Sequence, residues 1–155
     1  VLKPLNLSGG RGIVQLKSTD PSLDSIIDIL LGEEENFILA QKYIPEVRKG
    51  DKRILLLDGE VLGSFLRVPH KSDFRGNLHS GAHFKKSALT QNEKQIIKTI
   101  TPTLKKLGLY FVGLDIIGHF LTEANVTSPM GIREINSLQS LQTEKKIINW
   151  LSQII

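Results

Sequence analysis

Cysteine is absent from this chain of 155 residues, which excludes disulfides and thiolate chemistry. Long hydrophobic runs are absent too, because no apolar stretch approaches the roughly 20 residues that span a bilayer. No secretory signal pattern opens the sequence. These absences are compatible with a cytoplasmic protein that has no membrane partner, and this is what we expect.

The sequence has little excess charge of either sign. Twenty Lys and Arg residues stand against sixteen Asp and Glu residues, which leaves a net charge of +4. The clearest basic pairs are scattered along the chain: Lys52-Arg53, Lys85-Lys86, Lys105-Lys106 and Lys145-Lys146. Scattered pairs favour solvated faces over a nucleic-acid surface, so we expect no nucleic-acid partner. A modest positive excess also fits a small polyanionic ligand.

The remaining composition is that of an ordinary globular protein, with 40% hydrophobic and 23% charged residues. This length is enough for one domain with a core, or for two small lobes. The sequence begins at Val1 rather than at Met, inside an expected strand. We therefore expect a piece of a longer protein.

Hydrophobic spacing and turn residues predict an α+β fold with mainly antiparallel strands. The expected strands cover residues 1–5, 12–16 and 36–44, followed by a hairpin over 53–68 that turns at Asp58-Gly59. Three helices are expected: from the cap Asp20 and Pro21 to Gly32, from the capping box of Thr90 and Glu93 to Gly108, and from Thr143 to Ile155. Residues 70–87 show no periodicity and predict a long loop.

The stretch "YFVGLDIIGHFLTEANVTSP" places polar side chains inside two apolar strands. A three-residue turn over 118–120 would set Asp115 opposite Glu123, and Asn125 would share their face because strand side chains alternate. A two-residue turn would instead pair Asp115 with Thr122. Opposed carboxylates repel, and oxygen ligands suit a hard cation such as Mg²⁺. A metal site and an ordinary solvent-facing sheet surface both remain open.

Other candidate residues allow two interpretations each. Gly9 and Gly10 lie between two expected strands, where they could bring backbone N–H groups to phosphate or simply form a hairpin turn. Lys3, in an apolar strand, is either exposed at an edge or directed at an anion. Arg67, Arg75 and Asn77 could hold phosphate or carboxylate oxygens or serve loop solubility. The irregular spacing of the histidines argues against zinc.

Taken together, several motifs resemble the bacterial glutathione synthetases. They are "GDKRILLLDGE", "RVPHKSDFRGNL", "LGLYFVGLDIIG" and "LTEANVTSPMGIREIN", preceded by "VLKPL" with its glycines and "FILAQKYIPEVRKGDKR". The motifs follow the family's order from Val1 to about Asn136. The run from "VGLDIIG" to "NVTSP" is specific to this family within the wider ATP-grasp superfamily.

The resemblance implies an ATP-grasp fold, in which two α+β lobes with mainly antiparallel sheets hold ATP between them. The small lobe would cover about 1–40 and the large lobe about 41–155, and the family's N-terminal domain would be absent from this chain. The implied enzyme is a cytoplasmic, homo-oligomeric ligase. It joins γ-glutamylcysteine to glycine with ATP through an acyl phosphate, and it uses Mg²⁺, with Mn²⁺ as the alternative ion.

The resemblance also implies roles for individual residues. Lys3, Gly9 and Gly10 would contact the phosphates, and Gln41, Lys42, Tyr43 and Ile44 would border the adenine. Asp115, Glu123 and Asn125 would bind the metal. Arg67, Arg75 and Asn77 would face the phosphates and the acyl phosphate as catalytic residues, Ser128 and Pro129 would line the peptide substrate, and the loop 73–87 would close over the site.

Three departures from the family pattern stand out. Gly81-Ala82-His83 replaces the usual Gly-Gly-Arg, Asn6-Leu7-Ser8 stands where the first glycine loop usually carries Asp-Gly before its last glycines, and Ala124 stands within the TEINVTSP pattern. None removes a predicted metal ligand. The alternatives are a related carboxylate–amine ligase and a nucleotide-binding fragment without turnover. We expect the chain alone to be a poor ligase.

Overall fold

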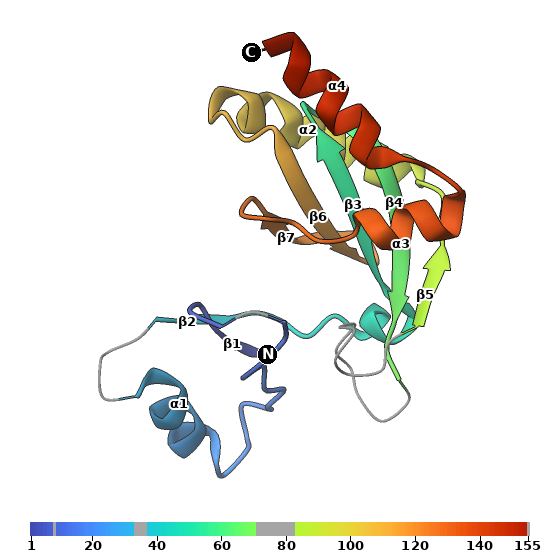
Figure 1. The fold of residues 1–155 in the computed structure, drawn as a ribbon. Helices are drawn as coiled ribbons and strands as arrows, with labels where there is room; N and C mark the ends of the chain where they lie inside the picture. Colours follow the sequence, from blue (N-terminus) through green and yellow to red (C-terminus); the bar gives the residue numbers. More distant parts are fainter. Residues whose placement is uncertain (8, 33–36, 71–82, 155) are drawn as a thin grey trace. The chain divides into compact units, whose positions relative to one another are not determined.

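The structure is a computed structural model that describes residues 1–7, 9–32, 37–70 and 83–154. The chain divides into two compact units, Val1–Pro45 and Glu46–Ile155. Each unit combines helix and strand (Figure 1).

The first unit is built on a short antiparallel pair, β1 (Leu2–Pro4) and β2 (Ile38–Ala40), in which Lys3 lies opposite Leu39. The strand predicted over 12–16 is reduced to a single bridge between Leu2 and Val14. The glycines before it explain the difference, because Gly10 and Gly12 adopt positive φ angles that turn the chain away from an extended path. The strand predicted over 36–44 is likewise reduced to β2.

Helix α1 (Leu23–Leu31) begins later than the sequence indicates. Asp20 does not cap it; its carboxylate accepts a hydrogen bond from the backbone N–H of Ser22 at 2.9 Å, and the turn that this bond closes precedes the helix. The predicted end at Gly32 is correct, since that glycine takes a φ of 63° there.

The second unit contains one antiparallel sheet of five strands in the order β5-β4-β3-β6-β7. Its strands are β3 (Asp51–Leu57), β4 (Glu60–Val68), β5 (His83–Lys86), β6 (Phe111–Ile117) and β7 (Phe120–Asn125). The predicted hairpin turn is confirmed, with positive φ angles of 49° at Asp58 and 81° at Gly59. The loop predicted over 70–87 is too long at its C-terminal end, because β5 lies there and pairs with β4. Residues 71–82 lie outside the described part.

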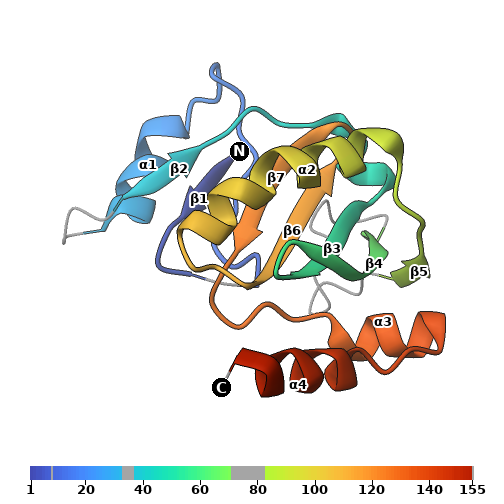
Figure 2. The same ribbon diagram turned by 90° about the horizontal axis from the view of Figure 1, so that it is seen from above.

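Helices cover both faces of this sheet and make three layers (Figures 1 and 2). Helix α2 (Gln91–Lys106) lies on one face, and α3 (Ile132–Gln139) and α4 (Thr143–Ile154) lie on the other. A short 3-10 helix, η1 (Pro45–Lys49), precedes β3. The sequence analysis missed α3, a helix of only eight residues.

Alternation along β3 assigns its side chains to the two faces. Ile54 and Leu56 belong to the apolar cluster with α2, whereas Leu55 and Leu57 belong to the cluster with α3 and α4. Arg53 continues the second series into a part of the sheet where charged side chains replace the apolar cluster. The central strand thus carries an apolar core at one end and a polar site at the other.

The N-terminus of α2 is bound to β3 on the face opposite to Arg53. Thr90 Oγ1 accepts from the Glu93 N–H and Glu93 Oε2 accepts from the Thr90 N–H, so the predicted capping box is confirmed. The same Glu93 oxygen accepts from the buried Lys52 Nζ at 2.8 Å, and Lys52 also donates to the Ala88 carbonyl. A buried ion pair therefore joins the strand to the helix.

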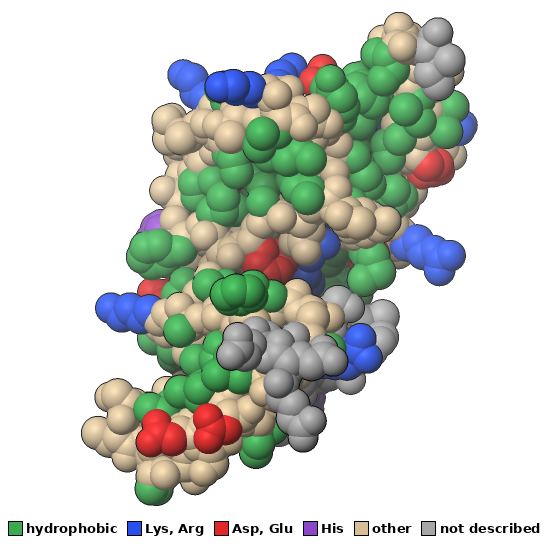
Figure 3. Space-filling view, turned by 90° about the vertical axis from the view of Figure 1, so that its left-hand side faces the viewer, with side chains coloured by type: hydrophobic (Ala, Val, Ile, Leu, Met, Phe, Trp, Pro, Cys, Tyr) green, Lys and Arg blue, Asp and Glu red, His purple; other side chains and the backbone are tan. Residues whose placement is uncertain are grey.

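Hydrophobic side chains gather over α4 on the surface (Figure 3). Ile148, Leu151 and Ile154 are exposed there, while Trp150 of the same helix packs against Tyr110 with ring centroids 5.3 Å apart. Among the helices of the described residues, none is both long and apolar enough to cross a membrane.

Candidate active site

The β6–β7 hairpin brings the predicted polar trio onto one face by a route that the sequence analysis did not foresee. The turn has two residues, since Ile117 pairs with Phe120, so of the two turns considered from the sequence the two-residue one forms. A bulge next to Asp115 then shifts the register, and Asp115 still lies opposite Glu123, with Gly113 opposite Asn125. The Thr122 hydroxyl donates to the Asp115 carbonyl at 3.1 Å across this bulge.

Asp115 is the buried centre of the site. Arg53 binds it in a bidentate manner, donating from Nε to Oδ1 and from Nη2 to Oδ2, the latter at 2.8 Å. Arg67 Nη2 lies 2.9 Å from Oδ2, and the Asn125 amide donates to the same oxygen at 3.3 Å. Burial opposes ionisation, but the hydrogen bonds and charges of the two arginines outweigh it and lower the pKa of Asp115.

Asp51 extends this network. Its Oδ2 accepts from Arg67 Nη2, so charges alternate along Asp51, Arg67, Asp115 and Arg53. Among the described residues, Asp51 Oδ1 and Arg67 Nε are buried and find no hydrogen-bond partner. Burial raises the pKa of Asp51 to about 7, with Arg67 acting against the rise and Asp115 adding to it. The site therefore holds two carboxylates whose pKa values are pushed in opposite directions.

Asp51 is expected to make stability depend on pH. Its pKa is raised above the ordinary 3.8, so its contribution is most favourable below pH 4 and is lost as the pH rises to about 7. The shift corresponds to at most about 4 kcal/mol. Asp51→Asn should flatten the change in unfolding free energy between pH 5 and pH 8, measured by urea denaturation with Trp150 fluorescence. Asp28→Asn, at an exposed position, should show the same change in unfolding free energy with pH as the wild type. A change in Asp51→Asn equal to that of the wild type would contradict this assignment.

The donor set of Asp115, Glu123 and Asn125 fits a hard divalent cation. Two carboxylates face each other across the strand pair and an amide lies beside them, all on one face. Glu123 is exposed, whereas Asp115 is 5% exposed at the side chain. Within the described residues there is no cluster of three His, Cys, Asp or Glu side chains that could hold a metal. A cation here would therefore need oxygens from its ligand or water as well, as Mg²⁺ usually does.

The segment after β7 runs beside this network. Ser128 has a φ of 50°, a strained value for a residue other than glycine, and Pro129 is buried. A Cβ atom on Gly113 would lie 2.9 Å from the Pro129 Cβ, so only glycine at this position admits Pro129. Arg53 Nη1 donates to the Met130 carbonyl at 2.9 Å. The predicted substrate-lining residues are thus tied to the Asp115 site.

The remaining predicted residues lie either in the first unit or outside the described residues. Lys3, Gly9, Gly10 and 41–44 belong to the first unit, where Gly9 and Gly10 adopt φ angles of 67° and 73° and Gln41 exchanges backbone hydrogen bonds with Val1. Arg75 and Asn77 lie outside the described residues. Their predicted roles stay predictions.

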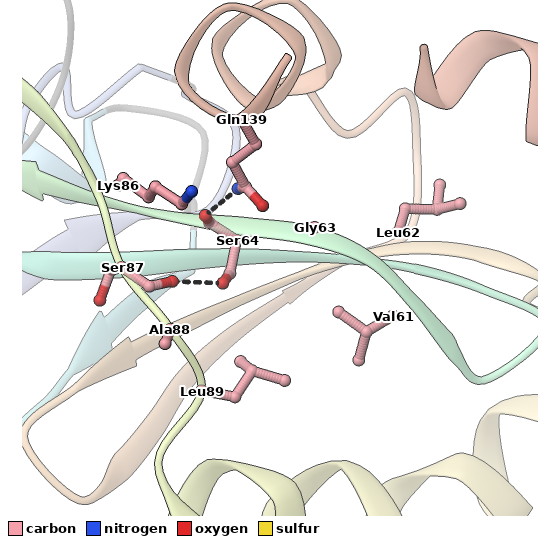
Figure 4. A pocket seen from close by; sticks show the side chains of 9 residues that line it. All are labelled: Val61, Leu62, Gly63, Ser64, Lys86, Ser87, Ala88, Leu89 and Gln139. Carbon is pink, nitrogen blue, oxygen red and sulfur yellow. Dashed lines mark hydrogen bonds between the residues drawn. The ribbon is translucent and has the colours of Figure 1, made fainter. Parts of the chain in front are cut away.

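A separate cavity of about 320 Å³ lies between β4, the chain leading into α2, and α3 (Figure 4). Gln139 Nε2 donates to the Ser64 carbonyl and Ser64 Oγ donates to the Ser87 carbonyl, both at 2.7 Å. None of the described candidate site residues lines it.

Sequence reasoning missed Asp51 and Arg53. The available signal was their spacing: residues 51 and 53 share the face of Leu55 and Leu57, so two opposite charges prolong an apolar stripe. Buried charges of this kind need partners, and Asp115 was already a candidate.

Comparison with known proteins identifies the class and then the family. Residues 1–140 match a family model, and the class that it describes is the ATP-grasp domain, which agrees with the α+β build of both units. The chain belongs to the family of prokaryotic glutathione synthetases, as part of their ATP-grasp domain.

Individual relatives agree with this assignment. The chain is 43% identical over 151 residues to a glutathione synthetase of Thermosynechococcus vestitus, covering 97% of this chain and 48% of that protein. It is 47% identical over 138 residues to one of Coxiella burnetii, covering 88% of this chain and 43% of that protein. A Vibrio cholerae relative is 43% identical over 150 residues, 96% and 47% of the two chains. The chain spans about half the length of these relatives.

Proposed function

We propose that this chain supplies the ATP- and metal-binding part of an enzyme that joins γ-glutamylcysteine to glycine. The single observation that carries the proposal is the register of β6 and β7, which sets Asp115, Glu123 and Asn125 on one face. The family to which the chain belongs supports the reaction, since its relatives are named glutathione synthetases. Ligation would use ATP to activate the peptide carboxylate as an acyl phosphate.

The residues would divide the work as follows. Asp115, Glu123 and Asn125 would hold Mg²⁺, or Mn²⁺ in its place, and the bound cation would neutralise charge on the phosphate oxygens. Arg67 would face the transferring phosphoryl group and stabilise its negative charge, aided by Arg75 and Asn77. Ser128 and Pro129 would line the peptide.

Nucleotide would be held by the first unit. Lys3 would contact phosphate oxygens, the Gly9-Gly10 turn would present backbone N–H groups, and residues 41–44 would border the adenine. The positive φ angles at both glycines support this role, because such a turn can direct successive N–H groups at one anion.

Lys3→Met is expected to weaken MgATP binding by about tenfold or more, since a hydrogen bond to a charged group contributes about 1.5–3 kcal/mol. Isothermal calorimetry on the 155-residue chain measures this. Lys17→Met, at an exposed position of the same unit, is the matched control and should bind like the wild type. Equal affinities for all three proteins would remove Lys3 from the nucleotide site.

The reaction itself is tested with a chimera. This chain would replace the matching 151 residues of the Thermosynechococcus vestitus relative, and glutathione formation from ATP, γ-glutamylcysteine and glycine would be measured. Turnover by the chimera supports the proposed reaction. A folded chimera that binds ATP without turnover would support a nucleotide-binding role instead, and turnover with another acceptor would support a related ligase.

A further inference from the structure

The Arg53 side chain packs against the backbone of two glycines. Its side chain is 9% exposed, and its stem lies against Gly113 and Gly131. A Cβ atom on Gly113 would lie 3.3 Å from Arg53 Nη1, and one on Gly131 would lie 3.5 Å from Arg53 Cγ. A side chain on Gly113 would crowd the guanidinium, whereas one on Gly131 would clash with Phe65 and only touch the Arg53 stem, so the backbone at both glycines bounds the path of Arg53 across the sheet.

All three guanidinium nitrogens of Arg53 have partners. Nε and Nη2 donate to the two oxygens of Asp115, and Nη1 donates to the Met130 carbonyl. A planar fork bound at three points cannot rotate without losing at least one of these bonds, whereas an ammonium group could not make all of them in this geometry.

We propose that Arg53 is a positioning residue that fixes the Asp115 carboxylate and the segment 128–130 in one mutual arrangement. It acts through Asp115, and the inference rests on the metal site proposed above. Hydrogen bonds from a neighbour to a ligating carboxylate orient it, and their loss typically weakens metal binding about 10–100-fold. Through its hydrogen bond to the Met130 carbonyl, Arg53 also fixes the segment that includes the predicted substrate-lining residues Ser128 and Pro129.

Arg53→Lys tests this by keeping the charge and removing the fork. Mn²⁺ binding to the 155-residue chain, measured by the electron paramagnetic resonance signal of the free ion, should weaken about tenfold. Amide hydrogen exchange at residues 128–131, without metal, should become faster. Gly113→Ala should act in the same direction without changing any charge, because its Cβ atom would displace Pro129 or the Arg53 fork.

The double variant Lys52→Met/Glu93→Gln is the control, since it removes a buried ion pair on the opposite face of the same strand without leaving either charge unpaired, and it should leave Mn²⁺ affinity unchanged. Wild-type affinity and exchange in both Arg53→Lys and Gly113→Ala would overturn the positioning role, as would an equal loss of affinity in the Lys52→Met/Glu93→Gln control. Failure of the wild type to bind Mn²⁺ would overturn the metal site itself, and with it this inference.

Discussion

Glu93→Gln is expected to destabilise the second unit by about 3–5 kcal/mol. The substitution leaves the Lys52 ammonium buried, 8% exposed at the side chain, with the Ala88 carbonyl as an acceptor but without its counter-charge. Breaking a buried ion pair by removing one partner has this cost because the remaining charge is uncompensated. The amide that replaces the carboxylate can still accept from the Thr90 N–H, so loss of the helix cap is a minor part of the effect.

Urea unfolding followed through Trp150, the single tryptophan of the sequence, measures this loss. The exposed variant Glu60→Gln is the matched control and should change the unfolding free energy by less than about 0.5 kcal/mol. Adding Lys52→Met to Glu93→Gln removes the orphaned charge and should recover most of the stability. A double variant as unstable as the single one would show that the buried charge is not the cause.

The sequence predicted those parts of the fold whose signals are local. The capping box of Thr90 and Glu93, the turn at Asp58-Gly59 and the glycine end of α1 each depend on a few adjacent residues, and all three were confirmed. Elements that depend on long-range pairing were missed, as β5 was, or predicted too long, as the strand over 12–16 was. Strand β5 depends on pairing with β4, and the bridge at Val14 depends on the path that preceding glycines impose, so neither has a periodicity of its own.

The site was predictable in composition and not in detail. Asp115, Glu123 and Asn125 do share a face, but the two-residue turn alone would have separated them, and the bulge that restores the register has no plain sequence signal. The buried partners Asp51 and Arg53 were missed because cross-strand neighbours such as Arg53 and Asp115, 62 residues apart in sequence, meet only in the folded sheet. Local chemistry thus indicated the candidate ligands, while the folded sheet supplied the charges that surround Asp115.

Glu123→Gln is expected to have the largest effect on activity. Glu123 lies opposite Asp115 on the hairpin and is exposed, so it can reach a cation that Asp115 alone, already bound by two arginines, would hold weakly. Removing a directly ligating charge should weaken Mn²⁺ binding at least about a hundredfold, since changes in the surrounding shell alone cost about 10–100-fold. Glutathione formation by the chimera at low Mg²⁺ should fall by a similar factor.

The same substitution should leave the fold intact, which separates a ligand from a structural residue. Glu123 is exposed, so its neutralisation should change the unfolding free energy by less than about 0.5 kcal/mol. High Mg²⁺ should restore part of the turnover, because a weakened site can still be filled by mass action. Near-normal turnover of Glu123→Gln at low Mg²⁺ would remove Glu123 from the metal site and leave Asp115 and Asn125 as parts of a structural network with Arg53 and Arg67.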